Sequence, residues 1–102
     1  MNYLIEENRR ELEQICRLRH VRRIDLLGSA TGPGFDVASS DLDFLVTFEE
    51  LPVSSYADTY FGLLEDLQEL FHRPVDLVVE SSIQNPYFRQ SVESTRTLVY
   101  AA

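Results

Sequence analysis

Apolar residues recur along the chain with two different periods, and the period separates expected helices from expected strands. Helical spacing predicts a first helix over residues 2–19 and a second, amphipathic one from about Pro52 to His72. Ser55, followed three residues later by Asp58, resembles a capping box and marks the start of the second helix. A shorter helix is expected over residues 86–93, after an Asn-Pro pair.

Strand-like segments lie between these helices. They are expected at residues 21–28, 41–48, 75–79 and 97–100, the last as an edge strand. The glycine-rich stretch 28–40 joins the first two strands, which predicts that they are neighbours. A helix joins the second and third strands, which permits a parallel crossover between them. The predicted fold class is therefore α/β (α+β), a small mixed sheet with helices packed on it.

Length and composition suit one compact domain spanning residues 1–102, of which 44% are hydrophobic. The single cysteine, Cys16, excludes an internal disulfide and is expected to be a small core residue. No apolar run is long enough to span a bilayer, and the charged N-terminus lacks an apolar signal region, so no membrane partner and a cytoplasmic location are expected.

The net charge of the chain indicates which kinds of partner it can bind. The net charge is −8, and all nine basic residues are arginines. Such a surface repels a phosphate backbone, so direct binding of nucleic acid is not expected. A basic protein, or a nucleotide whose charge is neutralised by metal ions, would be tolerated.

Acidic residues interrupt two of the expected strands. Asp41 and Asp43 are two positions apart in the alternating stretch DLDFLVTF, so both side chains leave the face opposite Leu42 and Phe44. Asp76 lies in VDLVV, again opposite the apolar positions. If these strands are adjacent and in register, three carboxylates meet at one point, where Mg²⁺ would relieve their repulsion.

A Gly-Ser turn precedes these acids. Gly28 ends a buried strand and, having no Cβ, would let a ligand approach the backbone closely. Backbone N–H groups of the following turn and the Ser29 hydroxyl could hold phosphate oxygens. Each of these short motifs occurs often without function, so the prediction depends on their order along the chain: Gly-Ser, then Ser40-Asp41, then Asp76.

In this order the motifs resemble those of the minimal nucleotidyltransferases, small members of the DNA polymerase β-type superfamily. The resemblance rests on GS at 28–29, SDLD at 40–43 and VDLVV around Asp76, and extends over most of the chain from about residue 21. It implies the nucleotidyltransferase fold, ATP as substrate and two Mg²⁺ ions. It further implies that Asp41, Asp43 and Asp76 bind the metals as catalytic residues, and that Gly28, Ser29 and Ser40 contact the triphosphate.

The resemblance also implies a partner. Family members of this size commonly act as antitoxins of HEPN-domain ribonuclease toxins, and some transfer AMP to a tyrosine of that toxin. The expected function is therefore adenylyl transfer to a HEPN toxin within a possible hetero-oligomer. Many members carry an arginine after the Gly-Ser turn, where this chain has Ala30-Thr31-Gly32. The alternative is a module that neutralises a toxin by occlusion, without catalysis.

One aromatic stretch is ambiguous. Residues 85–88, NPYF, place two aromatic residues, Tyr87 and Phe88, next to each other near a predicted helix start. Such residues usually seal the core, and this is the expectation here, with a partner-docking patch as the alternative.

Overall fold

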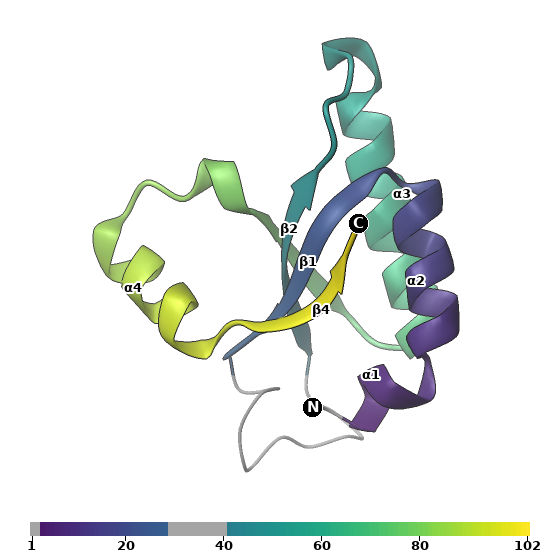
Figure 1. Cartoon of the computed structure of the whole chain (residues 1–102), viewed down its shortest axis with the longest axis horizontal. Helices are drawn as coiled ribbons and strands as arrows, with labels where there is room; N and C mark the ends of the chain where they lie inside the picture. Colours follow the sequence, from purple (N-terminus) through teal and green to yellow (C-terminus); the bar gives the residue numbers. More distant parts are fainter. Residues whose placement is uncertain (1–2, 29–40) are drawn as a thin grey trace.

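The computed structural model describes residues 3–28 and 41–102 as a four-stranded mixed sheet with helices on both faces (Figure 1). The elements follow one another in the order α1 (Tyr3–Glu7), α2 (Arg9–Leu18), β1 (Val21–Leu27), β2 (Leu42–Phe48), α3 (Val53–Phe71), β3 (Val75–Val79), the 3₁₀ helix η2 (Glu80–Ser82), α4 (Pro86–Thr95) and β4 (Thr97–Ala101). The fold class and all four strands agree with the expectation from the sequence. No helix within the described ranges has the length and apolarity required to cross a membrane.

The strand order is β3-β2-β1-β4. β1 pairs antiparallel with both β2 and β4, whereas β2 and β3 run parallel, joined by the crossover helix α3. β4 is an edge strand, as expected. The central pair, β1 and β2, brings the end of the first strand at Leu27 directly opposite Asp43. The topology thus places the start of the glycine-rich stretch beside the first strand-borne acid.

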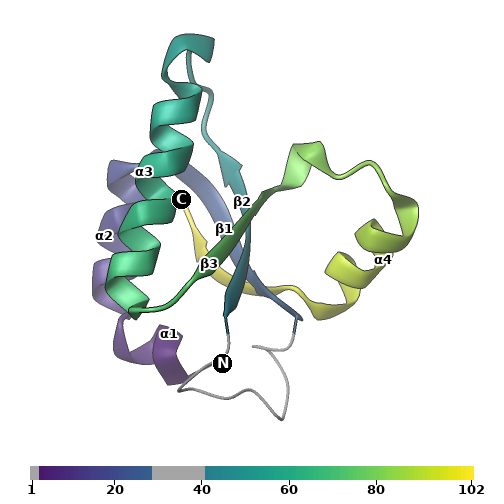
Figure 2. The same cartoon turned by 180° about the vertical axis from the view of Figure 1, so that it is seen from behind.

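The main hydrophobic core lies between the sheet and the helices α1, α2 and α3 (Figures 1 and 2). Phe44 of β2 stacks on Phe71 of α3, with ring centroids 6.0 Å apart. Cys16 is buried in this core, as expected, and burial raises the pKa of its thiol to about 12. The thiol therefore stays protonated at neutral pH and serves packing.

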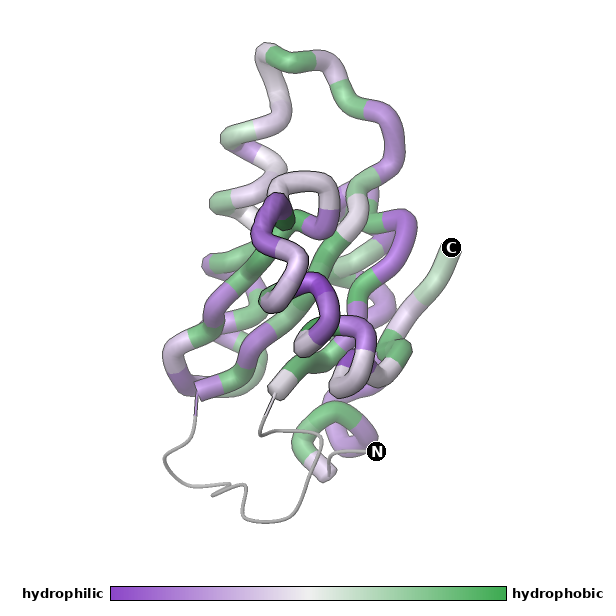
Figure 3. Tube along the Cα trace, turned by 90° about the vertical axis from the view of Figure 1, so that its left-hand side faces the viewer, coloured by the Kyte–Doolittle hydropathy of each residue, from purple (hydrophilic) through white to green (hydrophobic). Residues whose placement is uncertain are grey.

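α4 lies on the opposite side of the sheet from α1, α2 and α3 (Figure 2). The apolar cluster on this side is small: Leu27, Leu45 and Val92 are its buried members, with Val78 and Ile83 packed against them. Figure 3 shows the segment from η2 through α4 in front of the sheet, with mainly hydrophilic residues. This side of the molecule needs contacts other than hydrophobic ones to hold α4 in place.

Two local expectations are wrong. The first helix is broken at Asn8, because its side-chain amide donates to the Leu4 carbonyl (2.9 Å) and the backbone N–H of Asn8 turns to Ile5 (3.2 Å). The capping box is absent: α3 begins at Val53, and the Ser55 hydroxyl donates to the Pro52 carbonyl (3.1 Å).

The aromatic stretch 85–88 also differs from expectation. Tyr87 is 82% exposed and Phe88 43% exposed, so neither side chain seals the core. Asn85 and Pro86 start α4 as the sequence predicts, and the helix continues two residues beyond Glu93, to Thr95. The two aromatic residues on its first turn are therefore available for contacts outside the core.

Candidate active site

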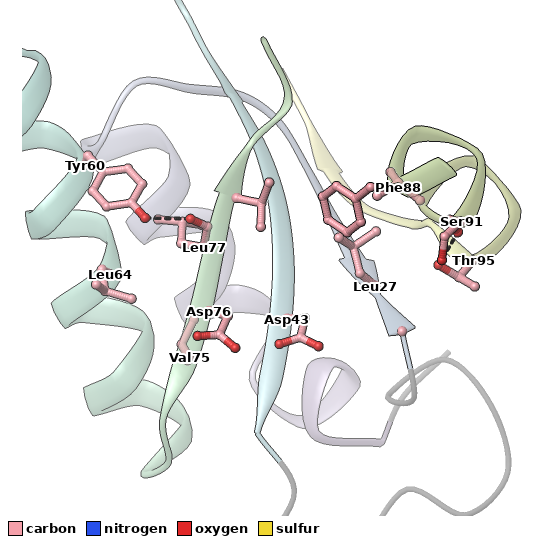
Figure 4. Close-up of a pocket in the computed structure, with 13 residues that line it drawn as sticks. Leu27, Asp43, Tyr60, Leu64, Val75, Asp76, Leu77, Phe88, Ser91 and Thr95 are labelled. Carbon is pink, nitrogen blue, oxygen red and sulfur yellow. Dashed lines mark hydrogen bonds between the residues drawn. The ribbon is translucent and has the colours of Figure 1, made fainter. Parts of the chain in front are cut away.

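Two acidic side chains from neighbouring strands face each other at one end of the sheet. Asp43 of β2 and Asp76 of β3 are register partners in the parallel pair. Neighbouring strands lie about 4.8 Å apart, so register partners on one face are within contact distance. Figure 4 shows both carboxyl groups side by side. The sequence predicted this juxtaposition on the condition that the strands are adjacent and in register, and both conditions hold.

The pair perturbs the protonation of Asp43. Burial of Asp43, a hydrogen bond between its carboxyl group and that of Asp76, and the charges of Asp76 and Asp41 all raise the pKa of Asp43. A hydrogen bond between two carboxyl groups requires one of them to hold a proton. Asp43 therefore keeps its proton to a higher pH than an isolated aspartic acid does, as expected for a partly buried carboxyl group beside like charges.

The other predicted site residues take different places. Asp41 lies just before β2, is exposed, and acts on Asp43 through its charge. Among residues 3–28 and 41–102, no three acidic, histidine or cysteine side chains are grouped closely enough to hold a metal ion. Ser29 and Ser40 lie outside the described residues, as does the stretch Ala30-Thr31-Gly32.

Gly28 follows β1 and lies beside Asp43 of the acidic pair. Its φ of +66° is in the left-handed region that side chains rarely adopt. A Cβ at this position would lie 3.4 Å from Asp43 Oδ2. A glycine here both permits the turn and leaves the Asp43 carboxylate accessible from the Gly28 side.

A cavity of about 510 Å³ opens beside the pair. The sheet contributes Leu27, Gly28, Asp43, Val75, Asp76, Leu77 and Val78; α4 contributes Phe88, Ser91, Val92 and Thr95; and α3 contributes Tyr60 and Leu64. The Tyr60 hydroxyl donates to the Leu77 carbonyl and fixes one side of this wall (Figure 4). No basic side chain lines the cavity among the residues that the structure describes.

A buried ionic cluster on the same face of the sheet was not anticipated. Asp25 in β1 is fully buried and accepts hydrogen bonds from Arg23 (2.8 and 3.0 Å) and from Arg96 (both 3.1 Å). Arg96, at the C-terminal end of α4, also donates to Glu80 of η2 (3.0 and 3.2 Å). A further arginine of α4, Arg89, donates to the Glu80 carboxylate at 3.4 Å.

The arginines set the charge state of Asp25. Burial acts to raise its pKa, but the hydrogen bonds from Arg23 and Arg96 outweigh burial and hold the pKa of Asp25 below its ordinary value. The carboxylate therefore stays ionised and ties β1 to α4. A charged residue inside the apolar run IDLL was the available signal for a buried ion pair. The sequence contained no signal that identified its partner Arg96, which lies 71 residues further along the chain.

The acidic pair fits a divalent metal ion by its chemistry. Mg²⁺ prefers carboxylate oxygens and keeps positions for water and phosphate oxygens. Asp43 and Asp76 supply such oxygens from neighbouring strands in register, and the charge of Asp76 raises the pKa of Asp43, so a cation between them would relieve their repulsion. Asp41 lies near enough for its charge to raise the pKa of Asp43, but among the described residues it is not grouped with the pair closely enough to complete a three-carboxylate site.

Comparison with known proteins agrees with this arrangement. Residues 9–99 match the model of the family "Nucleotidyltransferase domain". The chain is 34% identical over 90 residues to "Putative protein adenylyltransferase MJ1379" of Methanocaldococcus jannaschii, covering 87% of this chain and 88% of that protein.

Two solved structures show the same fold. A structure described as a "putative minimal nucleotidyltransferase" superimposes with a TM-score of 0.74 at 26% identity, over 95% of each chain. A complex of a tri-AMPylated Shewanella oneidensis HEPN toxin with its MNT antitoxin contains a chain that matches with a TM-score of 0.65 at 19% identity, over 96% of this chain and 73% of that one. The chain therefore belongs to the nucleotidyltransferase domain family and is similar over nearly its whole length to a minimal nucleotidyltransferase, as its Gly-Ser and Ser-Asp-x-Asp motifs indicated.

Proposed function

We propose that this chain is a protein adenylyltransferase that moves AMP from ATP to a tyrosine hydroxyl of a HEPN-domain toxin and thereby acts as its antitoxin. The observation that carries the proposal is the Asp43–Asp76 pair, in register on adjacent strands and next to Gly28. The relative named as a protein adenylyltransferase and the AMPylated toxin bound to a similar fold support the choice of reaction and partner.

The reaction is a displacement at phosphorus. The acceptor oxygen forms a bond to the α-phosphorus of ATP, and the bond from that phosphorus to the bridging oxygen breaks, so pyrophosphate leaves with the electron pair. The hydroxyl proton passes to a carboxylate or to water. Phosphoryl transfer of this kind depends on positioning and charge stabilisation more than on covalent chemistry by the protein.

Each site residue has a part in this proposal. Asp41, Asp43 and Asp76 would hold two Mg²⁺ ions, which supply positive charge to the triphosphate and lower the pKa of the acceptor hydroxyl. Gly28 leaves room for phosphate oxygens beside Asp43. Asp76 is exposed, so it can be reached by a hydroxyl presented on a partner's surface. Ser29 and Ser40 would contact phosphate oxygens.

The test is transfer of label from α-³²P-ATP to a purified HEPN-domain toxin, in the presence of Mg²⁺. Asp43→Asn and Asp76→Asn should each reduce transfer at least about 100-fold, because loss even of groups that only support metal ligands costs roughly 10–100-fold. Asp58→Asn is the matched control. Asp58 is an exposed acid of α3 that does not line the cavity, so its substitution should leave transfer unchanged.

Two outcomes would contradict the proposal. Transfer that survives both substitutions would exclude catalysis by the acidic pair. Neutralisation of the toxin without any label, and unchanged by either substitution, would instead favour occlusion. Peptide mass spectrometry of the labelled toxin then identifies the modified side chain, which the proposal requires to be a tyrosine.

A further inference from the structure

One wall of the cavity carries an aromatic ring. Phe88, on the first turn of α4, points from the helix toward the sheet and lies beside Leu27 (Figure 4). The acidic pair lies at the Gly28 end of the same cavity. An apolar, aromatic wall and a charged end thus share a single recess.

The lining restricts what can bind in this recess. Its described residues include no arginine, lysine or histidine, so the recess away from the acidic pair offers no cation to a phosphate group. The apolar side chains Leu27, Val78 and Val92, together with the Phe88 ring, favour a flat and uncharged group. The Ser91 and Thr95 side chains add polar atoms on the same wall.

We infer that this wall of α4 binds the nucleobase of the nucleoside triphosphate, with the base lying against the Phe88 ring. The inference rests on the proposed function, which puts the triphosphate at the Gly28 end. The volume of about 510 Å³ is in the range of small-molecule sites, whereas an acceptor hydroxyl is presented on the surface of a folded partner. Stacking of a base on an aromatic side chain tolerates any base and contributes to affinity in many nucleotide-binding proteins.

The wall is held in place from both ends of the helix. At its start, the Asn85 side chain accepts hydrogen bonds from the backbone N–H groups of Tyr87 (2.8 Å) and Phe88 (3.2 Å). At its end, Arg96 binds Asp25 of the sheet. The cap therefore orders the turn that carries Phe88, and the Arg96 contact ties the end of the same helix to the sheet.

The experiment compares the Kd of Mg·ATP with that of Mg·tripolyphosphate, which lacks the nucleoside, by calorimetry. Phe88→Ala and Phe88→Leu should raise the Kd of Mg·ATP by roughly 5- to 150-fold, as loss of one base–aromatic stack does. Neither should alter the Kd of Mg·tripolyphosphate. Phe88→Trp, which retains a flat aromatic ring, should bind Mg·ATP with about the wild-type Kd. Tyr87→Ala is the matched control, since this neighbouring aromatic residue is exposed and does not line the cavity.

Four results would overturn the inference. Equal weakening of both ligands by Phe88→Ala would mean that the ring acts through the fold. Unchanged Mg·ATP affinity with a raised KM for the partner protein would assign the wall to the acceptor side chain. A wild-type chain that binds tripolyphosphate and ATP equally would have no base site at all, although adenylyl transfer would remain possible. Failure of the proposed function is distinguished by wild-type binding of neither ligand, which removes both proposals.

Discussion

Asp43 and Asp76 are register partners on parallel strands, and burial of Asp43 together with the carboxyl group of Asp76 raises the pKa of Asp43 above its ordinary value of 3.8. At a pH between 3.8 and the raised pKa, the Asp43 carboxyl group is therefore protonated more often in the folded state than in the unfolded chain. Stability from this group is present when Asp43 is protonated and is lost as the pH rises from 3.8 through the raised pKa.

Asp43→Asn should consequently gain stability relative to wild type over that pH range. Opposed like charges on neighbouring strands cost roughly 0.5–1 kcal/mol, which corresponds to a Tm difference of roughly 2–8 °C for a chain of this size. Thermal melts of both proteins without divalent ions, from pH 4 to 7, measure this difference, and other acids cancel in the comparison. A difference independent of pH would show that the pair is not electrostatically coupled.

Added Mg²⁺ should reverse the ranking at neutral pH. A cation that binds the folded state raises the wild-type Tm, and the rise should be smaller in Asp43→Asn and Asp76→Asn. Calorimetric titration with Mg²⁺ alone gives the affinity directly. Equal Tm increases in all three proteins would mean that the ion binds elsewhere.

The Asp25–Arg96 contact should contribute strongly to stability. Asp25→Asn removes one partner of a buried ion pair and leaves Arg96 only Glu80 and Glu93, which predicts a loss of about 3 kcal/mol at pH 7. Because the pKa of Asp25 is lowered, this contribution should disappear as the pH falls below 3.8 through that lowered pKa, and the two proteins should converge there. Urea denaturation at several pH values measures both effects.

A surface ion pair provides the control for this prediction. Glu13→Gln breaks the Arg17–Glu13 pair, whose atoms are 3.8 Å apart, with Arg17 exposed and Glu13 partly exposed, and should cost less than about 0.5 kcal/mol. If Asp25→Asn cost no more than Glu13→Gln, the buried cluster would not be what holds α4 to the sheet.

Gly28→Ala should destabilise the fold by about 1–2 kcal/mol, because the left-handed backbone at φ +66° disfavours any residue with a Cβ. Gly28→Asn should cost less, since asparagine adopts this conformation more readily. Chemical denaturation of the two variants separates backbone strain from the added contact with Asp43 Oδ2. Equal losses in both would point to the contact.

Asn85→Ala should weaken the start of α4. The substitution removes the acceptor for the N–H groups of Tyr87 and Phe88 and should cost about 0.5–2 kcal/mol. Hydrogen exchange at these two amides should accelerate, whereas Asn85→Ser, which can still cap the helix, should keep most of the protection. Unchanged exchange in the alanine variant would exclude a capping role.

Most of the fold could be predicted because its strands and long helices repeat apolar residues at regular spacing. The acidic pair was also predictable, since alternation in DLDFLV and VDLVV fixes which face each aspartate takes. Local competition for hydrogen bonds was not predictable: the Asn8 side chain takes the carbonyl that a continuous helix would need.

Contacts between residues far apart in the sequence could not be predicted either. Asp25 gave a signal as a charge among apolar residues, but nothing in the spacing linked it to Arg96. The exposure of Phe88 was missed for a related reason. A helix that is attached by ionic contacts needs little apolar burial, so its aromatic residues need not face the core.

The sheet is covered by two layers that differ in what attaches them. On the side of α1, α2 and α3 the layer is attached by a large apolar core, and on the side of α4 by a small cluster and a few charged side chains. The attachment of residues 80–96 to the sheet therefore depends on a few side chains, above all on Arg96, whereas the attachment of α1, α2 and α3 is spread over many. Substitutions accumulating on this outer layer would change what the protein recognises at little cost to the underlying scaffold.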